Sequence, residues 1–385
     1  MRTLTTTEDL AAFCAQAAQA PYVTVDTEFL RERTYFAKLC LVQLAYPGDG
    51  ETDAVLVDPL AAGMSLDPLY DLFRDTNVVK VFHAARQDLE IFFVEGNVFP
   101  EPLFDTQVAA MVCGFGDQAG YETLVRKIAH AQVDKSSRFT DWSRRPLNDA
   151  QQSYALADVT HLRDVYVHLR DELETSGRSG WLQEELQILT SPGTYRIEPS
   201  EAWKRVKTRT NSGKFLAIVR ELAAFRESHA QTRDVPRNRV FKDDALVELA
   251  SLKPKSHEEL GRARLLLRDA RKGDIAEGIL QAVKAGVACA PGNHPVADRS
   301  REKLNVNPAI ADLLRVLLKA KTETTGVAPK LIATASDLDA ISAGMRDMPA
   351  LQGWRADVFG NDALRLCEGE VALSSKNGAV IIVEV

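Results

Sequence analysis

The chain has 385 residues, of which 45% are apolar and 26% charged, a composition typical of globular proteins. Its length predicts two or three domains rather than one. No apolar stretch approaches the run of about 18 residues that a membrane-spanning helix needs, and the first ten residues lack the apolar region of a secretory signal. We therefore expect no membrane contact and a cytoplasmic protein.

The five cysteines occur singly, at positions 14, 40, 113, 289 and 367. Paired spacings are typical of disulfide frameworks and zinc sites, so both are disfavoured and buried free thiols are expected. The net charge of −7 hides a segregation along the chain. Residues 1–175 carry 15 basic and 27 acidic groups, whereas residues 201–242 carry 11 basic and 4 acidic groups. This pattern favours cation binding in the first region and polyanion binding in the second.

The first half alternates strand-like and helical patterns, which predicts an α/β domain. A helix is expected over 7–16, with Thr7 as its N-cap. Strands are expected at 22–25, 37–45, 54–57 and 78–82, followed by helices at 84–93 and 149–174.

From 176 to 199 glycine and proline interrupt the pattern, which predicts a linker. Two helical sets follow, at 215–228, 242–250, 257–267 and 271–285, and then at 307–321, 328–333, 335–345 and 348–359. The sequence identifies no partner for the β-branched tail 379–385.

Carboxylates gather at three places along the chain. Asp26 and Glu28 are two residues apart at the end of a predicted strand, so their side chains share one face. Tyr154 and Asp158 are four residues apart on a predicted helix, which also places them on one face. Asp88 falls in the first turns of another helix. Taken alone, each place has a more ordinary interpretation: a solvated strand end for Asp26 and Glu28, a pair on a helix surface for Tyr154 and Asp158, and a favourable helix-dipole charge for Asp88. Carboxylates are, however, the hard oxygen ligands that Mg²⁺ and Mn²⁺ prefer.

The three segments resemble the exonuclease motifs of the DEDD superfamily, and of the ribonuclease D family in particular. The segments are Val25-Asp-Thr-Glu-Phe29, Lys80-Val-Phe-His-Ala-Ala-Arg-Gln-Asp-Leu-Glu90 and Tyr154-Ala-Leu-Ala-Asp158. One branch of the superfamily has histidine five positions before the last aspartate, which here is Ser153. The other has tyrosine four positions before it, which here is Tyr154, so the chain resembles the tyrosine branch.

This resemblance implies an α/β ribonuclease H-like exonuclease domain over residues 1–175, with a mixed sheet flanked by helices. It also implies that Asp26, Glu28, Asp88 and Asp158 bind two divalent cations, Mg²⁺ or Mn²⁺. Hydrolysis would proceed from a free 3′ end and release 5′-mononucleotides. Because an ordinary phenol has a pKa of about 10, we expect Tyr154 to orient water rather than to act as a base.

Residues 221–250 resemble an HRDC domain, a helical module associated with nucleic-acid binding. We therefore expect a linker over 176–204, two all-α HRDC-type domains over 205–290 and 291–375, and a tail over 376–385. The expected partner is RNA with a free 3′ end, tRNA precursors above all, bound by a monomer. The candidate RNA-binding residues are Phe29, His83, Trp142, Arg237, Arg239 and Lys242.

Two other functions stay open at this point. A DNA exonuclease of the same superfamily would use the same carboxylates and cations, and preference between matched RNA and DNA strands would distinguish it. A non-catalytic RNA-binding scaffold is disfavoured, because all four carboxylates and Tyr154 are present.

Overall fold

The computed structural model describes residues 2–48, 52–134, 136–296 and 304–385. The chain divides into two compact units: Met1–Glu28, Cys40–Ser191 and Lys303–Val385 form one, and Phe29–Leu39 and Pro192–Glu302 form the other. Within the described ranges, no helix is both long and apolar enough to cross a membrane. All five cysteines are free thiols, of which Cys14 and Cys40 are buried and the others partly buried.

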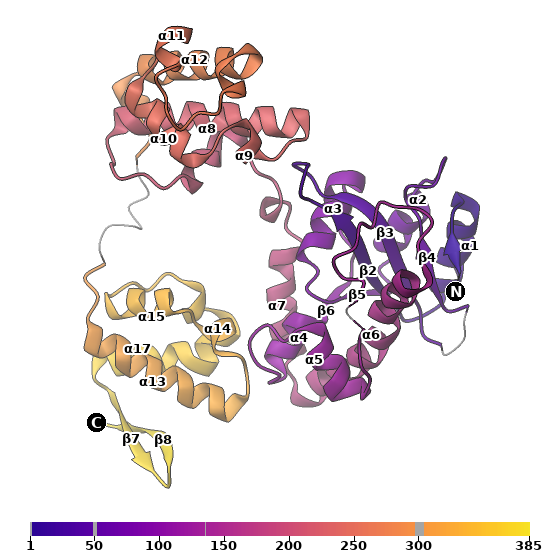
Figure 1. The fold of residues 1–385 in the computed structure, drawn as a ribbon. Coiled ribbons are helices and arrows are strands. Elements are labelled where there is room, and N and C mark those ends of the chain that lie inside the picture. Colours follow the sequence, from indigo (N-terminus) through magenta and orange to yellow (C-terminus); the bar gives the residue numbers. More distant parts are fainter. Residues whose placement is uncertain (1, 49–51, 135, 297–303) are drawn as a thin grey trace. The chain divides into compact units, whose positions relative to one another are not determined.

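The centre of the first unit is a six-stranded sheet (Figure 1). β1 pairs in parallel with β4, β2 with β5, and β5 with β6, whereas β3 and β4 are antiparallel. The predicted mixed sheet is therefore confirmed. Its strand order is β1 (Thr3–Leu4), β4 (Ala54–Val57), β3 (Lys38–Ala45), β2 (Tyr22–Leu30), β5 (Val79–Phe82) and β6 (Leu103–Asp105). The sequence did not predict β1 and β6, because strands of two and three residues are too short to show an alternating pattern.

Helices flank this sheet. Their bounds are α1 (Thr7–Ala17), α2 (Asp67–Arg74), α3 (Arg86–Gly96), α4 (Thr106–Val112), α5 (Tyr121–Leu124), α6 (Asp149–Ser176) and α7 (Ser179–Leu189). The N-cap of α1 is Thr6 rather than the predicted Thr7, because the Thr6 side chain accepts a hydrogen bond from the Asp9 N–H at 3.2 Å. α7 lies inside the stretch that we predicted to be a linker, where the buried Leu182 and Leu186 are one helical turn apart.

The second unit is helical, with five α-helices in its described residues. They are α8 (Gly213–Arg233), α9 (Arg237–Val240), α10 (Asp243–Leu252), α11 (His257–Leu260) and α12 (Gly273–Ala288). The predicted helix over 257–267 is therefore only one turn long. α8 and α12 approach closely at Gly286, where an added Cβ would lie 2.5 Å from the Ile218 Cα. Glycine at this position thus allows the two helix backbones to meet.

The segment Phe29–Leu39, directly after the Asp26-Thr-Glu28 motif, belongs to this helical unit. The Tyr35 hydroxyl donates a hydrogen bond to Glu227, a residue that is 1% exposed. An Asp234 carboxylate oxygen accepts from the Tyr35 and Phe36 N–H groups, each at 3.0 Å. The chain that leaves the motif strand is therefore held by α8 and its C-terminal cap.

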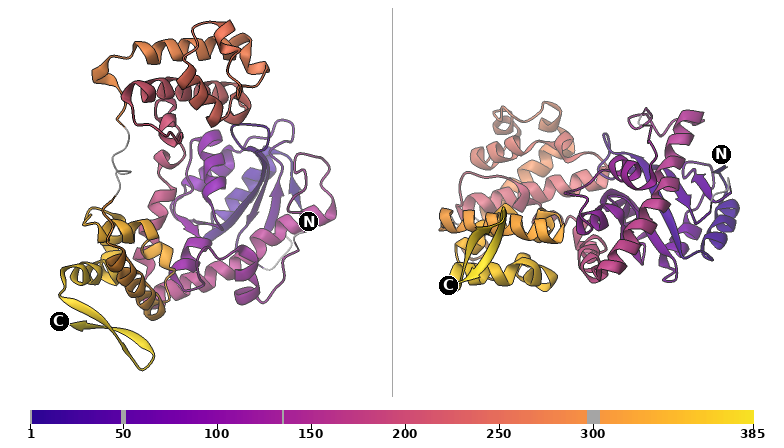
Figure 2. Two further views of the ribbon diagram at one scale, coloured as in Figure 1. Left: turned by 60° about the vertical axis from the view of Figure 1, so that its left-hand side comes forward. Right: turned by 90° about the horizontal axis from the view of Figure 1, so that it is seen from below.

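The C-terminal region belongs to the first unit and has its own apolar core. Its elements are α13 (Pro308–Thr325), α14 (Pro329–Ile332), α15 (Ala335–Ser342), α16 (Gly353–Arg355), α17 (Asn361–Glu368), β7 (Val371–Lys376) and β8 (Ala379–Glu384). The predicted helix over 348–359 is instead a series of short turns: a 3₁₀ turn at Pro349–Leu351, α16, and a π-helical turn at Ala356–Gly360. The β-branched tail pairs with β7 as an antiparallel hairpin (Figure 2). Trp354 stacks on Trp181 of α7 with ring centroids 4.8 Å apart.

Candidate active site

Strand β2 carries the first two carboxylates. Because side chains alternate along a strand, Asp26 and Glu28 project from the same face of β2. The sequence had predicted that both residues lie at the end of the strand. The strand instead continues to Leu30, so both lie within it. Both side chains are partly buried.

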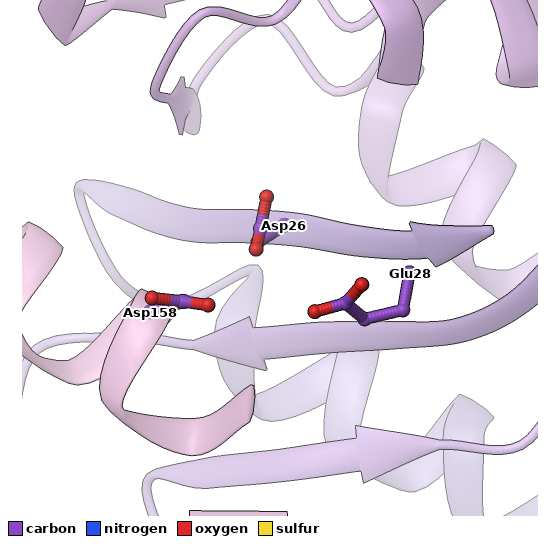
Figure 3. Close-up of side chains that lie close together, drawn as sticks. All are labelled: Asp26, Glu28 and Asp158. Atoms are coloured by element: carbon purple, nitrogen blue, oxygen red, sulfur yellow. The ribbon is translucent and has the colours of Figure 1, made fainter. Parts of the chain in front are cut away.

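Helix α6 brings Asp158 to these carboxylates. Ligand oxygens of Asp26, Glu28 and Asp158 all lie within 4.8 Å of one another (Figure 3). The Thr24 hydroxyl, on β2, is 2.8 Å from the Val159 carbonyl of α6 and 3.0 Å from the Ala45 carbonyl of β3. Thr24 therefore ties the helix to the strand one residue beyond Asp158. Sequence reasoning missed this positioning residue, because a threonine in a strand is ordinary.

Asp88, on α3, lies beside this cluster but is not among the three residues with mutually close oxygens. Its carboxylate accepts a hydrogen bond from the Thr27 hydroxyl, and it is 6% exposed. The turn before α3 is held by Asp105, whose carboxylate accepts from the Ala84 and Ala85 N–H groups at 3.0 and 2.8 Å. Asp105 thereby sets the start of the helix that carries Asp88.

Burial raises the pKa of all four carboxyl groups, and repulsion from neighbouring carboxylates adds to the rise at Asp26, Glu28 and Asp88. Burial is the largest cause at each of them. The pKa of Glu28 rises to about 10, with further contributions from the negative charges of Asp26 and Asp158. The pKa of Asp158 rises to about 7, because burial outweighs the hydrogen bond from Tyr154 and the positive charge of Arg138. A bound cation would relieve this repulsion and would favour the ionised carboxylates.

Tyr154 lies one helical turn before Asp158 on α6 and donates its hydroxyl hydrogen to that carboxylate. Burial and the neighbouring carboxylates raise the pKa of the Tyr154 phenol well above its ordinary value. The phenol therefore stays protonated at neutral pH and serves as a hydrogen-bond donor. Its ring lies 6.0 Å from that of Trp142.

The donor set fits hard divalent cations. Four carboxylates without a cysteine or a histidine match the oxygen ligands that Mg²⁺ and Mn²⁺ prefer. In the part of the chain that the structure describes, Asp26, Glu28 and Asp158 form the one acidic, histidine or cysteine cluster with ligand atoms this close together.

Comparisons with known proteins identify the family. A family model described as 3′-5′ exonuclease matches residues 1–174, and one described as HRDC domain matches residues 215–283. Ribonuclease D of Jannaschia sp. (strain CCS1) is 66% identical over 383 residues, which cover 100% of this chain and 99% of that protein. The chain belongs to the ribonuclease D family. It is therefore a hydrolase, a 3′→5′ exoribonuclease of a family that depends on divalent metal ions.

Further ribonuclease D proteins support this assignment. That of Nitrobacter hamburgensis is 47% identical over 385 residues, with 100% of each chain covered. Among solved structures, the crystal structure of Escherichia coli RNase D matches with a TM-score of 0.82 and 28% identity. The match covers 95% of this chain and 98% of that one. The fold resemblance thus extends over the HRDC domain and over the C-terminal region. The HRDC family model matches the first of these two regions, at residues 215–283.

The structure places the predicted RNA-binding residues in different surroundings. Trp142 is only 2% exposed and packs near Tyr154, so its ring is not open to a nucleobase and the prediction of direct contact is not supported. His83 and Phe29 are partly buried. The His83 ring nitrogen Nδ1 is 3.0 Å from the Thr106 hydroxyl, and burial lowers the pKa of His83 below its ordinary value, which favours the neutral ring.

The HRDC domain has an open hollow of about 580 Å³, lined by apolar residues and by three cations. Its lining includes His229, Arg233, Arg239 and Lys272, together with Asp274 at the start of α12. Of the three predicted cations of this domain, Arg239 lines the hollow, Lys242 is exposed elsewhere and Arg237 is partly buried. Of these three cations, Arg239 is thus the one that lines the hollow.

Proposed function

We propose that the enzyme removes 5′-mononucleotides from the 3′ end of RNA with two divalent cations, Mg²⁺ or Mn²⁺, held by Asp26, Glu28, Asp88 and Asp158. The observation that carries this proposal is the approach of the Asp26, Glu28 and Asp158 oxygens to within 4.8 Å of one another, with Asp88 alongside. When bound, such cations supply an activated water and offset the charge on the departing 3′-oxygen.

The side chains around the cations have separate roles. The four carboxylates orient the cations, and their raised pKa values mean that protons leave the site when cations bind. Tyr154, with its hydroxyl hydrogen-bonded to Asp158, orients the attacking water. Its raised pKa argues against a role as the general base.

We assign the substrate to small structured RNAs with 3′ extensions, tRNA precursors above all. Two findings support this: the Escherichia coli relative is described as involved in structured RNA processing, and this chain has an HRDC domain with a hollow whose lining includes Arg233, Arg239 and Lys272. We propose that the exposed cations Arg239 and Lys242, with Arg237 beside them, contact RNA phosphates, and that the C-terminal region acts as a second HRDC-like module. The enzyme would act as a monomer.

The test is digestion of a 3′-extended tRNA transcript, with its products resolved at single-nucleotide steps, in Mg²⁺ and in Mn²⁺. Stepwise loss from the 3′ end with release of 5′-mononucleotides is expected, with no activity in EDTA. Matched single strands of DNA and RNA serve as the second substrate pair. Asp26→Asn is the inactive control, and a variant of an exposed residue in the C-terminal tail, Val385→Ala, is the active one.

Three outcomes would contradict the proposal. Cuts inside the transcript would exclude an exonuclease, and equal or faster degradation of DNA would favour the alternative substrate. Undiminished metal-dependent activity in a folded Asp26→Asn protein would show that the carboxylate cluster is not the active site.

A further inference from the structure

The loop before α6 is anchored next to the carboxylate cluster. Ser137 is 4% exposed, and its carbonyl accepts hydrogen bonds from the Thr140 N–H and hydroxyl at 3.2 and 2.9 Å. The Gln151 side chain, in the first turn of α6, donates to the Thr140 hydroxyl at 3.1 Å. The buried Trp142 packs near Tyr154 on the same helix. The loop is thus fixed to the helix that carries Asp158.

The far end of the loop is held by Arg145. Its guanidinium donates two hydrogen bonds to Asp58, at 2.6 and 2.7 Å, and one to the Cys40 carbonyl at 2.6 Å. A planar guanidinium that binds a carboxylate through two nitrogens has a defined orientation. Arg145 therefore fixes the loop to β3 and to the residue after β4.

Between these anchors, Arg138 and Phe139 project into solvent. Phe139 is 91% exposed, more than any other large apolar side chain in the described ranges. The guanidinium carbon of Arg138 lies 5.3 Å from the centre of the Phe139 ring, a cation–π arrangement. A single exposed apolar residue is ordinary on a protein surface. An exposed ring paired with a cation on an anchored turn, beside an acidic active site, is a more specific combination.

Arg138 is also close to the reaction centre in electrostatic terms. Its positive charge acts on the Glu28 and Asp158 carboxyl groups, whose pKa it lowers. The site is otherwise acidic and would repel a polyanion. Arg138 thus supplies positive charge where a phosphate must approach the carboxylates.

We propose that Arg138 and Phe139 form a substrate subsite in which the Phe139 ring stacks on a nucleobase near the RNA 3′ end and the Arg138 guanidinium pairs with an adjacent phosphate. This inference rests on the proposed function, because it takes the carboxylate cluster as the active site. Aromatic stacking accepts every base, which suits an enzyme that removes successive nucleotides of any sequence. The anchors hold the pair in place, so little conformational entropy is lost when RNA binds.

The first test is steady-state hydrolysis of a short single-stranded RNA. Phe139→Ala is expected to raise KM about tenfold, the loss expected for one stacked base. Phe139→Trp should keep KM near that of the unaltered enzyme, because tryptophan restores the stacking surface, whereas Phe139→Leu should behave like Phe139→Ala. Val385→Ala, an 85% exposed apolar residue of the C-terminal tail, outside the predicted second HRDC-like module, is the matched control. Since Phe139 is almost fully exposed, its variants should keep the thermal stability of the parent.

A second measurement separates stacking from a general effect on structure. RNAs with one abasic nucleotide at each position near the 3′ end are compared in turn. At one position the abasic RNA should bind more weakly to the parent enzyme, and Phe139→Ala should add no further loss there. Arg138→Ala should lower the slope of log KM against log salt concentration by about 0.7, the value for one phosphate contact on a single strand, and Arg138→Lys should keep it.

Two results separate the subsite from the function on which it rests. If Asp158→Asn keeps full activity, the proposed active site itself is wrong. If Asp158→Asn is inactive, the active site stands. The subsite is then refuted if Phe139→Ala leaves KM within about twofold of the parent enzyme, or if Phe139→Ala weakens the binding of every abasic RNA as much as that of the intact RNA.

Discussion

Replacing Asp158 with asparagine should abolish hydrolysis and stabilise the metal-free enzyme at the same time. The pKa of Asp158 rises from an ordinary 3.8 to about 7 in the folded protein, chiefly because the carboxyl group is buried. A difference of about 3 pKa units corresponds to about 4 kcal/mol in the free energy of unfolding. The asparagine amide has nearly the same shape, carries no charge and still accepts the hydrogen bond from Tyr154. Loss of a cation ligand should lower kcat on the order of 100-fold or more.

The pH dependence of this stabilisation follows from the direction of the pKa shift. Between about pH 4 and 7 the folded Asp158 binds a proton that the unfolded residue has released, so the metal-free parent enzyme loses stability as the pH rises through this window. The parent and Asp158→Asn should therefore be similar near pH 4 and differ most above pH 7. Thermal unfolding in EDTA across this range measures the difference, and addition of Mn²⁺ should raise the Tm of the parent more than that of the variant.

The reasoning would be refuted by an Asp158→Asn protein that is less stable than the parent in EDTA at pH 8 and gains as much from Mn²⁺. The amide would then have broken a favourable interaction instead of removing the cost of a buried charge. The Leu313→Ala variant, whose side chain is remote in sequence from every candidate ligand, controls for the effect of substitution alone.

Three other substitutions test separate parts of the structure. Tyr154→Phe should lower kcat about tenfold, the equivalent of one hydrogen bond, and should leave the rise in Tm on metal binding as it is in the parent enzyme. An unchanged kcat would exclude a catalytic role for the Tyr154 hydroxyl. Arg145→Lys should destabilise the enzyme by about 1–3 kcal/mol, because lysine cannot bind Asp58 through two nitrogens. If calorimetry finds no change, the two-nitrogen contact with Asp58 does not contribute to stability. Gly286→Ala should destabilise the HRDC domain by about 1–3 kcal/mol, because the new Cβ would meet Ile218 of α8; a Tm equal to that of the parent would mean that the two helices separate at no cost.

Part of the active site is encoded in local spacing. Asp26 and Glu28 share a face because side chains alternate along a strand, and Tyr154 and Asp158 share one because a helix turns every 3.6 residues. These periodicities depend on the backbone alone, so the sequence predicted both pairs. Local spacing does not predict that these two pairs and Asp88 form one site. The resemblance to the family motifs provided that prediction. The helix α6 and the strands β3, β4 and β5 were predicted within two residues for the same reason, and the end of α8 was missed by five.

Contacts between distant segments required the tertiary structure. The pairing of the C-terminal tail with β7, the burial of Trp142 and the Thr24 bond to α6 all join residues whose approach no local period encodes. An aromatic residue in a polar loop has the same local pattern whether it packs inside or projects outward. Trp142 and Phe139, three residues apart, have opposite exposures because Trp142 packs near Tyr154 while Phe139 lies on the turn between the anchors. The sequence by itself thus determined which side chains carry the chemistry, and the fold decided which neighbouring residues are available to the substrate.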